Sequence, residues 1–229
     1  KQSMITLKTK SNKTMATHTL PSFKTASFAA DIDKETLNSL PKATFHGRII
    51  IVDTLQKLHS AIKALETVHL VGVDTETKPN FIPGKKVSVA LLQVSTLEVC
   101  YLFRLNLIGF PEELKKFLER ADLLKIGLSL RDDISRLKSM TDFNPIGFIE
   151  LQQMASAYGI QCASLQKIYG ITHGLYMSKA QRMTNWEAPI LTDNQQAYAA
   201  LDAQACLEIY LKFMDEEHPH PAQFGLITL

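Results

Sequence analysis

The chain has 229 residues, of which 45% are hydrophobic and 21% are charged, a composition typical of one globular domain with at most an extension. No apolar run approaches the roughly 20 residues that a membrane-spanning helix requires. The formal net charge of +2 includes five lysines and no acidic residue within residues 1–30, so the remaining chain is slightly acidic. Nucleic-acid binding would therefore depend on local basic patches or metal ions.

Residues 1–44 are expected to form an N-terminal extension with little fixed structure, because residues 1–30 are rich in Ser, Thr and Lys and poor in hydrophobic residues. The three cysteines lie far apart and form no CxxC pair. A disulfide framework or a cysteine zinc site is therefore not expected. The cysteine pattern favours a reducing, cytoplasmic compartment.

The folded domain is expected over residues 45–214, followed by a C-terminal tail over residues 215–229. Apolar and β-branched runs predict four early strands, the last two joined as a hairpin, at Arg48–Val52, Leu70–Glu76, Val87–Val94 and Leu97–Phe103. A helix capped by Asp53 or Thr54 is predicted between the first two strands. The stretch Lys78–Lys86 contains two prolines and a glycine and predicts a loop.

Helices become dominant in the second half of the domain. A strand is predicted at Leu124–Gly127, and helices are predicted at Pro111–Arg120 and Arg131–Met140. The segment Gly147–Leu151 is compatible with a further strand or with the entry to a helix. Thr192 and Gln195 have the spacing of a capping box, which predicts a long helix through Phe213. Early strands with helices interleaved and then dominant predict a mixed sheet flanked by helices.

A pair of acids at the end of a buried strand is the first candidate site. Asp74 and Glu76 lie two residues apart, so their side chains share one face of the strand. Two such carboxylates are costly to bury unless they are paired or bind a metal ion, and their oxygens suit Mg²⁺ or Mn²⁺. Taken alone, the pair is also compatible with a strand that runs out into solvent.

Two helices carry further candidate residues. Tyr198 and Asp202 are four residues apart in a predicted helix and therefore lie on one face. Asp132 and Asp133 occupy the first turn of another helix, where acids often do no more than complement the helix dipole. Asp133 has Leu137 one turn later, so it lies beside the inward face and can point into a cleft. Each of these signals alone is unspecific.

Taken in order, the signals resemble the three motifs of a known superfamily. A strand-borne DxE, a central Asp at a helix start and a late YxxxD resemble the motifs of the DEDD superfamily of 3′–5′ exonucleases, in the subgroup whose third motif carries tyrosine. The segments Ser178–Trp186 and Pro189–Thr192 resemble the stretch before the third motif in Werner-type and ribonuclease D-type exonucleases. The resemblance covers about residues 46–214.

The resemblance implies an α/β, ribonuclease H-like fold with a mixed five-stranded sheet flanked by helices. It implies two divalent cations, Mg²⁺ or Mn²⁺, as cofactors. The four acids that would bind these ions map to Asp74, Glu76, Asp133 and Asp202, and the fifth catalytic residue maps to Tyr198. Asp132 remains the alternative to Asp133.

Phosphodiester hydrolysis needs an activated water and a stabilised leaving oxygen, which two metal ions about 3.5–4 Å apart provide. In this arrangement we expect Asp74 to bind both ions and Asp133 to serve the second ion. Glu76 and Asp202 would complete the site of the ion that activates the water. Tyr198 would hydrogen-bond and orient that water.

Basic residues are candidates for substrate binding. Lys179 and Arg182 can bind backbone phosphates, Arg in bidentate fashion, or can be solvated surface charges. The basic stretch Lys78–Lys86 is a candidate nucleic-acid contact or a solvated charge run. Trp186 is expected to pack in the core rather than to stack on a base.

The expected function is that of a metal-dependent 3′–5′ exonuclease. It would act on nucleic acid with a free 3′ end and release nucleoside 5′-monophosphates, with DNA slightly favoured because the Asn185–Trp186 stretch is closer to the Werner type. One alternative is a ribonuclease D-like enzyme that trims RNA. Another is a nucleic-acid-binding domain without catalysis, against which the five intact site positions argue. The sequence carries no signal for an oligomeric state.

Overall fold

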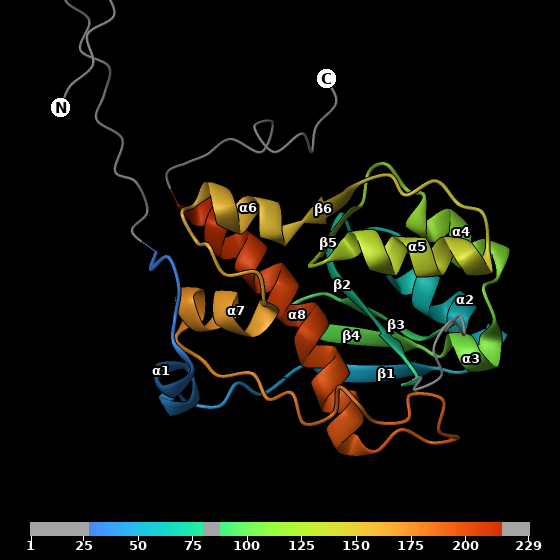
Figure 1. Ribbon diagram of the computed structural model, residues 1–229. Helices are drawn as coiled ribbons and strands as arrows, with labels where there is room; N and C mark the ends of the chain where they lie inside the picture. The colour runs from blue at the N-terminus through green and yellow to red at the C-terminus, as the bar shows by residue number, and fades with distance from the viewer. Residues whose placement is uncertain (1–27, 80–87, 217–229) are drawn as a thin grey trace, which may run out of the picture.

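The structure is a computed structural model that describes residues 28–79 and 88–216 (Figure 1). It contains a mixed sheet of six strands in the order β1-β4-β3-β2-β5-β6. β3 runs antiparallel to β2 and β4, whereas the β1–β4, β2–β5 and β5–β6 pairs are parallel. The strands are β1 Arg48–Val52, β2 Leu70–Thr77, β3 Val89–Ser95, β4 Val99–Phe103, β5 Leu124–Gly127 and β6 Phe148–Glu150.

The predicted mixed sheet is confirmed, but the predicted number of five strands is wrong by one. β6 has three residues, pairs in parallel with β5 at the edge of the sheet and passes directly into the next helix. Side-chain alternation cannot be recognised over three residues. This strand exists because β5, which is distant in the sequence, supplies its hydrogen-bonding partner.

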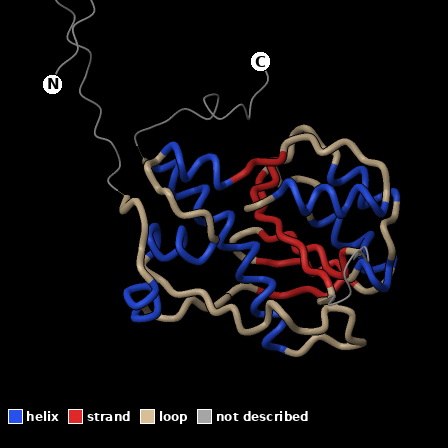
Figure 2. The backbone as a smooth tube through the Cα atoms, viewed as in Figure 1, coloured by secondary structure: helices blue, strands red, loops and turns tan. Residues whose placement is uncertain are grey.

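Helices cover both faces of the sheet, and Figure 2 shows the strands in red between two groups of helices. One apolar cluster joins one face to α2, α4 and α5, for example through Leu58, Phe117 and Leu137. Two other clusters join the opposite face to α6, α7 and α8. The helices are α1 Lys34–Ser39, α2 Leu55–Ala64, α3 Leu105–Ile108, α4 Glu112–Leu118, α5 Leu130–Met140, α6 Leu151–Ala157, α7 Leu165–His173 and α8 Asp193–Asp215.

The long helix α8 crosses the sheet in close contact with β2 (Figure 1). Its start is fixed by the predicted capping box, in which Thr192 Oγ1 accepts from the Gln195 backbone N–H at 3.2 Å and Gln195 Oε1 accepts from that of Thr192 at 3.0 Å. A Cβ atom at Gly72 of β2 would lie 1.9 Å from the Ala203 carbonyl oxygen. Glycine alone permits this approach, which brings α8 down onto the strand that carries Asp74.

We expect Gly72→Ala to destabilise the fold, because the added methyl group must displace the backbone of α8. Overpacking of this kind typically costs about 1–3 kcal/mol, which lowers the Tm of a domain of this size by roughly 2–12 °C. Calorimetry measures the change. Gly170→Ala is the control, because its methyl group would meet flexible side-chain ends, those of Leu37, Leu40 and Ile32, instead of backbone. Equal Tm values for Gly72→Ala and the wild type would contradict the expectation.

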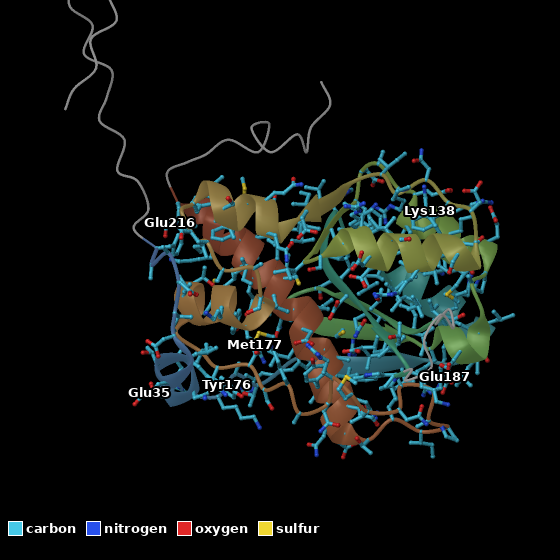
Figure 3. The ribbon with its side chains drawn as sticks, in the orientation of Figure 1. Glu35, Lys138, Tyr176, Met177, Glu187 and Glu216 are labelled. Carbon is cyan, nitrogen blue, oxygen red and sulfur yellow. The ribbon has the colours of Figure 1, made fainter. Side chains whose placement is uncertain are left out.

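The folded part of the chain begins before the predicted residue 45. α1 and the segment after it pack on the domain, and the Ala43 N–H donates to the Tyr176 carbonyl while the Tyr176 N–H donates to that of Pro41, both at 2.8 Å. Figure 3 shows Glu35 and Tyr176 at the same end of the molecule. The short segment has too few apolar residues to signal this docking in the sequence.

Several predicted segments lie outside the described residues. These are residues 1–27 of the N-terminal extension, residues 217–229 of the C-terminal tail and most of the basic loop Lys78–Lys86. Among the helices of residues 28–79 and 88–216, none combines the length and the apolar character needed to cross a membrane.

Candidate active site

Three carboxylates from β2 and α8 converge at one point. Asp74 and Glu76 share the face of β2 that α8 covers, as their spacing predicts, and Asp202 projects from α8 toward them. One carboxylate oxygen of each residue lies within 4.8 Å of the other two. The pairing of β2 with β3 shifts between Glu76 and Thr77, and such a bulge re-aims side chains at the end of a strand.

Tyr198 lies one turn before Asp202 on α8 and is partly buried beside the acids. Burial, followed by the charges of Asp202 and Glu76, raises the pKa of its hydroxyl above the usual range. The hydroxyl therefore stays protonated and available as a donor, and its interaction with Asp202 favours the charged form of that carboxyl group. Tyr198 also lines a cavity of about 430 Å³ together with Ser178 and Gln181.

Asp133 reaches the site from α5, whereas Asp132 faces solvent. Asp133 is 9% exposed and accepts a hydrogen bond from Thr75 Oγ1 at 2.6 Å. It stands outside the set of three carboxylates that lie within 4.8 Å of one another, although its charge raises the pKa of both Asp74 and Glu76. The structure therefore brings Asp133 to the border of the cluster.

The start of α5, which positions Asp133, depends on a residue that sequence reasoning missed. Glu150 accepts hydrogen bonds from the backbone N–H groups of Ser129 and Leu130 at 3.0 and 2.7 Å. Ser129 adopts a left-handed conformation with a φ of 62°. Glu150 is the last residue of the short edge strand β6, and no local pattern links it to a helix start so distant in the sequence.

The carboxylates are held together at an electrostatic cost. Burial raises the pKa of Glu76 to about 9, with a further contribution from the charges of Asp202 and Asp133. Burial and the same neighbouring charges raise the pKa of Asp74, and burial raises that of Asp202. Protons or a cation relieve such a cluster, and an all-oxygen donor set suits a hard divalent ion. The residues present therefore fit Mg²⁺ or Mn²⁺.

We expect the metal-free protein to lose stability as the pH rises. Acids titrate near pH 4 in an unfolded chain, whereas the pKa of Glu76 is about 9 in the folded state. Between these values the folded state binds more protons than the unfolded state, so the free energy of unfolding decreases with rising pH. The Tm in EDTA should fall between about pH 5 and pH 9, and Mg²⁺ should restore most of the loss.

Calorimetry at constant ionic strength tests this pH dependence. Glu76→Gln is the matched variant, because it removes one acid of raised pKa and keeps the side-chain shape. Its Tm should fall less steeply with pH than that of the wild type. A Tm of the metal-free wild type that rises across this pH range would contradict the expected sign.

The basic residues predicted to bind substrate lie near the acids. Lys179 and Arg182 are exposed, on the loop between α7 and α8. The charge of Arg182 lowers the pKa of Glu76, and that of Lys179 lowers the pKa of Asp202. On the same loop, Glu187, which is labelled in Figure 3, forms an ion pair at 3.3 Å with Lys78, the residue after β2.

Buried contacts anchor this loop to the sheet. Trp186 is 0% exposed and packs among residues of β3, β4 and α8, which confirms its predicted role as a packing residue. Gln195 Nε2 donates to Thr184 Oγ1 at 3.0 Å. The Arg104 guanidinium, buried after β4, donates to the Ala188 carbonyl. Arg104 is a lone arginine after an apolar strand, so nothing in the sequence indicates that Ala188 is its partner.

Residues 49–217 match the family model described as 3′-5′ exonuclease. The mouse protein named bifunctional 3′-5′ exonuclease/ATP-dependent helicase WRN is 35% identical over an alignment of 150 residues that covers 62% of this chain and 11% of that protein. A 3′-5′ exonuclease of Arabidopsis thaliana is 27% identical over 197 residues, covering 77% of this chain and 67% of that protein. The chain thus spans about a tenth of the mouse relative.

Solved structures show the same fold. Escherichia coli RNase D superposes with a TM-score of 0.67 at 23% identity, covering 73% of this chain and 44% of that chain. The Nibbler EXO domain of Aedes aegypti gives a TM-score of 0.66 at 23% identity, and the match covers 75% of this chain and 90% of that chain. These matches confirm the expected ribonuclease H-like α/β fold.

Proposed function

Because the chain belongs to the 3′-5′ exonuclease family, we propose that it removes nucleotides one at a time from a free 3′ end and releases nucleoside 5′-monophosphates. As a member of this family it is a phosphodiester hydrolase. The observation that carries the proposal is the convergence of the Asp74, Glu76 and Asp202 carboxylates, with Tyr198 beside them. We assign the catalytic unit to residues 45–214 and place the protein in the reducing interior of the cell, since its cysteines are free.

The acidic cluster would hold the divalent cations on which the family depends. We propose that Asp74, Glu76 and Asp202 form one ion site and that Asp74 and Asp133 contribute to a second. The bound cations would lower the pKa of the attacking water and stabilise the leaving oxygen. The protein's part is to fix the carboxylates in place, which the close contact of α8 with Gly72 achieves.

Other side chains of this site position the reactants. The protonated Tyr198 hydroxyl would hydrogen-bond the attacking water and hold it in line with the scissile phosphate. Lys179 and Arg182 would bind backbone phosphates of the substrate, and Arg182 has the planar geometry for a bidentate contact. The phosphate stays on the departing terminal nucleotide, because water attacks the phosphorus while the 3′-oxygen of the penultimate sugar leaves.

We expect Tyr198→Phe to lower kcat by about 10²-fold, because it removes only the hydroxyl that orients the water. KM and the Mg²⁺-induced rise in Tm should change little. Steady-state kinetics on a single-stranded oligonucleotide and calorimetry with Mg²⁺ measure these quantities. A loss as complete as that of a carboxylate variant would show that the hydroxyl does more than position a water molecule.

We propose DNA as the preferred substrate and RNA as the alternative. The Asn185–Trp186 stretch favours the Werner type, and DNA polymerase I of Aquifex aeolicus is among the relatives, at 29% identity. A ribonuclease D of Trypanosoma brucei, solved with RNA U12, shares the fold at 20% identity. Digestion of matched DNA and RNA oligonucleotides in parallel separates the two, and a higher kcat/KM on RNA would overturn the DNA preference.

A 5′-labelled oligonucleotide tests the reaction itself. Samples taken over time should give a descending ladder, and single strands should be digested faster than paired ends, since unstacking costs on the order of 1–2 kcal/mol per step. Immediate release of a labelled mononucleotide, or cleavage of a closed circle, would contradict 3′–5′ polarity. Asp202→Ala runs beside the wild type, so that a contaminating nuclease is recognised. Binding without any digestion would favour a non-catalytic role.

A further inference from the structure

Gln93 of β3 is a buried amide whose hydrogen-bonding groups both lack a partner. Its side chain is 0% exposed, and neither Nε2 nor Oε1 has a hydrogen-bond partner among the described residues. A buried polar group without a partner typically costs about 1–3 kcal/mol. Packing alone would be better served by leucine or methionine, so this amide calls for a functional explanation.

The sheet register places Gln93 directly beside the acidic cluster. Gln93 is the cross-strand partner of Asp74. Side chains of directly opposed residues lie on the same face, with Cβ atoms about 4.5–5.5 Å apart. That face is the one against α8, because Gly72, two residues before Asp74, meets the Ala203 carbonyl. Gln93 is therefore the neighbour of Asp74 beneath the helix that carries Asp202.

A second buried donor without a partner lies in the same layer. Trp186 Nε1 is unpartnered among the described residues, and the Trp186 side chain is 0% exposed. Trp186 belongs to the apolar cluster that contains Leu91 and Leu102. These two leucines are next to Gln93 on its face of the sheet, one two residues away on β3 and the other opposite it on β4. An amide carbonyl can accept from an indole N–H while its NH₂ group donates elsewhere.

We propose that Gln93 is a positioning residue of the metal site. When the metal site is occupied, its Nε2–H donates to the Asp74 carboxylate, and its Oε1 accepts from the Trp186 indole. A neutral donor suits this place, because a hydrogen bond to a carboxylate favours its charged form without adding to the negative charge of the cluster. Partners of this kind fix the orientation of a metal ligand.

This arrangement would couple the metal site to the loop that carries Lys179 and Arg182, because Trp186 anchors that loop. The inference rests on the proposed function, since it assumes that Asp74 binds a divalent cation. It adds a route by which occupation of the metal site reaches the substrate-binding loop: a cation held by Asp74 fixes that carboxylate in place to accept from Gln93, and Gln93 in turn holds the Trp186 indole.

Metal binding to Gln93→Met tests the proposal without reference to activity. Removing an outer partner of a metal ligand typically weakens metal affinity about 10–100-fold, and we expect a loss of this size for Mn²⁺ in titration calorimetry. The Tm of the metal-free variant should stay the same or rise, because an unpartnered amide is replaced by an apolar group of similar shape. A purely structural role predicts the opposite: a lower Tm and unchanged affinity.

Gln204→Met is the matched control. Gln204 is also a buried glutamine, but its amide donates to the Leu97 carbonyl at 2.8 Å, away from the acids. This variant should lose stability and keep the wild-type affinity for Mn²⁺. An affinity of Gln93→Met within about twofold of the wild type would overturn the proposal.

Trp186 gives a readout that needs no variant, because it is the single tryptophan of the chain. Titration of the metal-free wild type with Mg²⁺ should change its fluorescence emission, and Gln93→Met should abolish the change. A rise in Tm with Mg²⁺ but an unchanged emission would overturn the coupling through Gln93. The absence of any Mg²⁺ or Mn²⁺ binding by the wild type would instead overturn the proposed function, and the inference with it.

Discussion

Asp74→Asn is expected to lower the rate of 3′-end hydrolysis by at least about 10³-fold and to leave the fold intact. Asp74 is one of three carboxylates whose oxygens lie within 4.8 Å of one another, and it alone is proposed to serve both ion sites. Asparagine keeps the shape of the side chain but removes the negative charge that holds a cation. Metal ions contribute several kcal/mol of charge stabilisation, and about 4 kcal/mol corresponds to roughly 10³-fold in rate.

The Tm of the Asp74→Asn variant distinguishes a loss of catalysis from misfolding. Burial and neighbouring charges raise the pKa of Asp74, so its neutral replacement should raise the Tm of the metal-free protein while it abolishes the Mg²⁺-induced rise. Asp132→Asn is the matched control, because Asp132 is exposed and should tolerate the change. The Asp133→Asn variant should hydrolyse the substrate clearly more slowly than the Asp132→Asn variant. The reverse order would show that the assignment of the middle motif is wrong by one residue.

Chelation of divalent cations is expected to abolish digestion completely and reversibly. The acidic cluster offers oxygen donors only, and these bind Mg²⁺ or Mn²⁺ in preference to softer ions. The apolar clusters that hold the two helix layers to the sheet contain no metal-dependent contact among the described residues, so the fold should survive. EDTA should therefore remove activity and leave a cooperative thermal transition.

Dialysis into EDTA, followed by addition of Mg²⁺ or Mn²⁺, measures this dependence. Activity should return with the added ion, and the ion concentration needed should fall as the pH rises, because cations and protons compete for carboxyl groups of raised pKa. Digestion that continues undiminished after thorough chelation would contradict the metal-dependent mechanism. Loss of the thermal transition in EDTA would show that the metal is required for folding as well.

Much of the candidate site was predictable because its signals are local. The period of two in a strand places Asp74 and Glu76 on one face, and the spacing of four in a helix places Tyr198 and Asp202 on one face. Neither pattern states how far the strand pair lies from the helix pair. The ordered set of motifs supplied that link through a family resemblance, and the structure then gave the separation of the carboxylates.

Other parts depended on contacts between distant residues. Lys125 is 0% exposed and donates to the carbonyls of Leu118 and Arg120 at 2.9 and 2.8 Å, and nothing near it in sequence predicts a buried lysine. The partner of Asp133 is Thr75, which lies on the strand between the two motif acids but belongs to no motif. Gln93 lies within an apolar strand that gives no sign of its cross-strand partner.

The sequence by itself determined the strands and helices that carry the site acids, their faces and the residue types of the site, because helix caps, turns and side-chain periodicity depend on residues a few positions apart. Only the tertiary structure decided that β6 exists as an edge strand, that residues 28–44 pack on the domain and that Asp133 borders the cluster while Asp132 faces solvent. These outcomes depend on close packing between distant segments. The contact of Gly72 with Ala203 is the clearest case, because it sets how near α8, and with it Asp202, comes to β2.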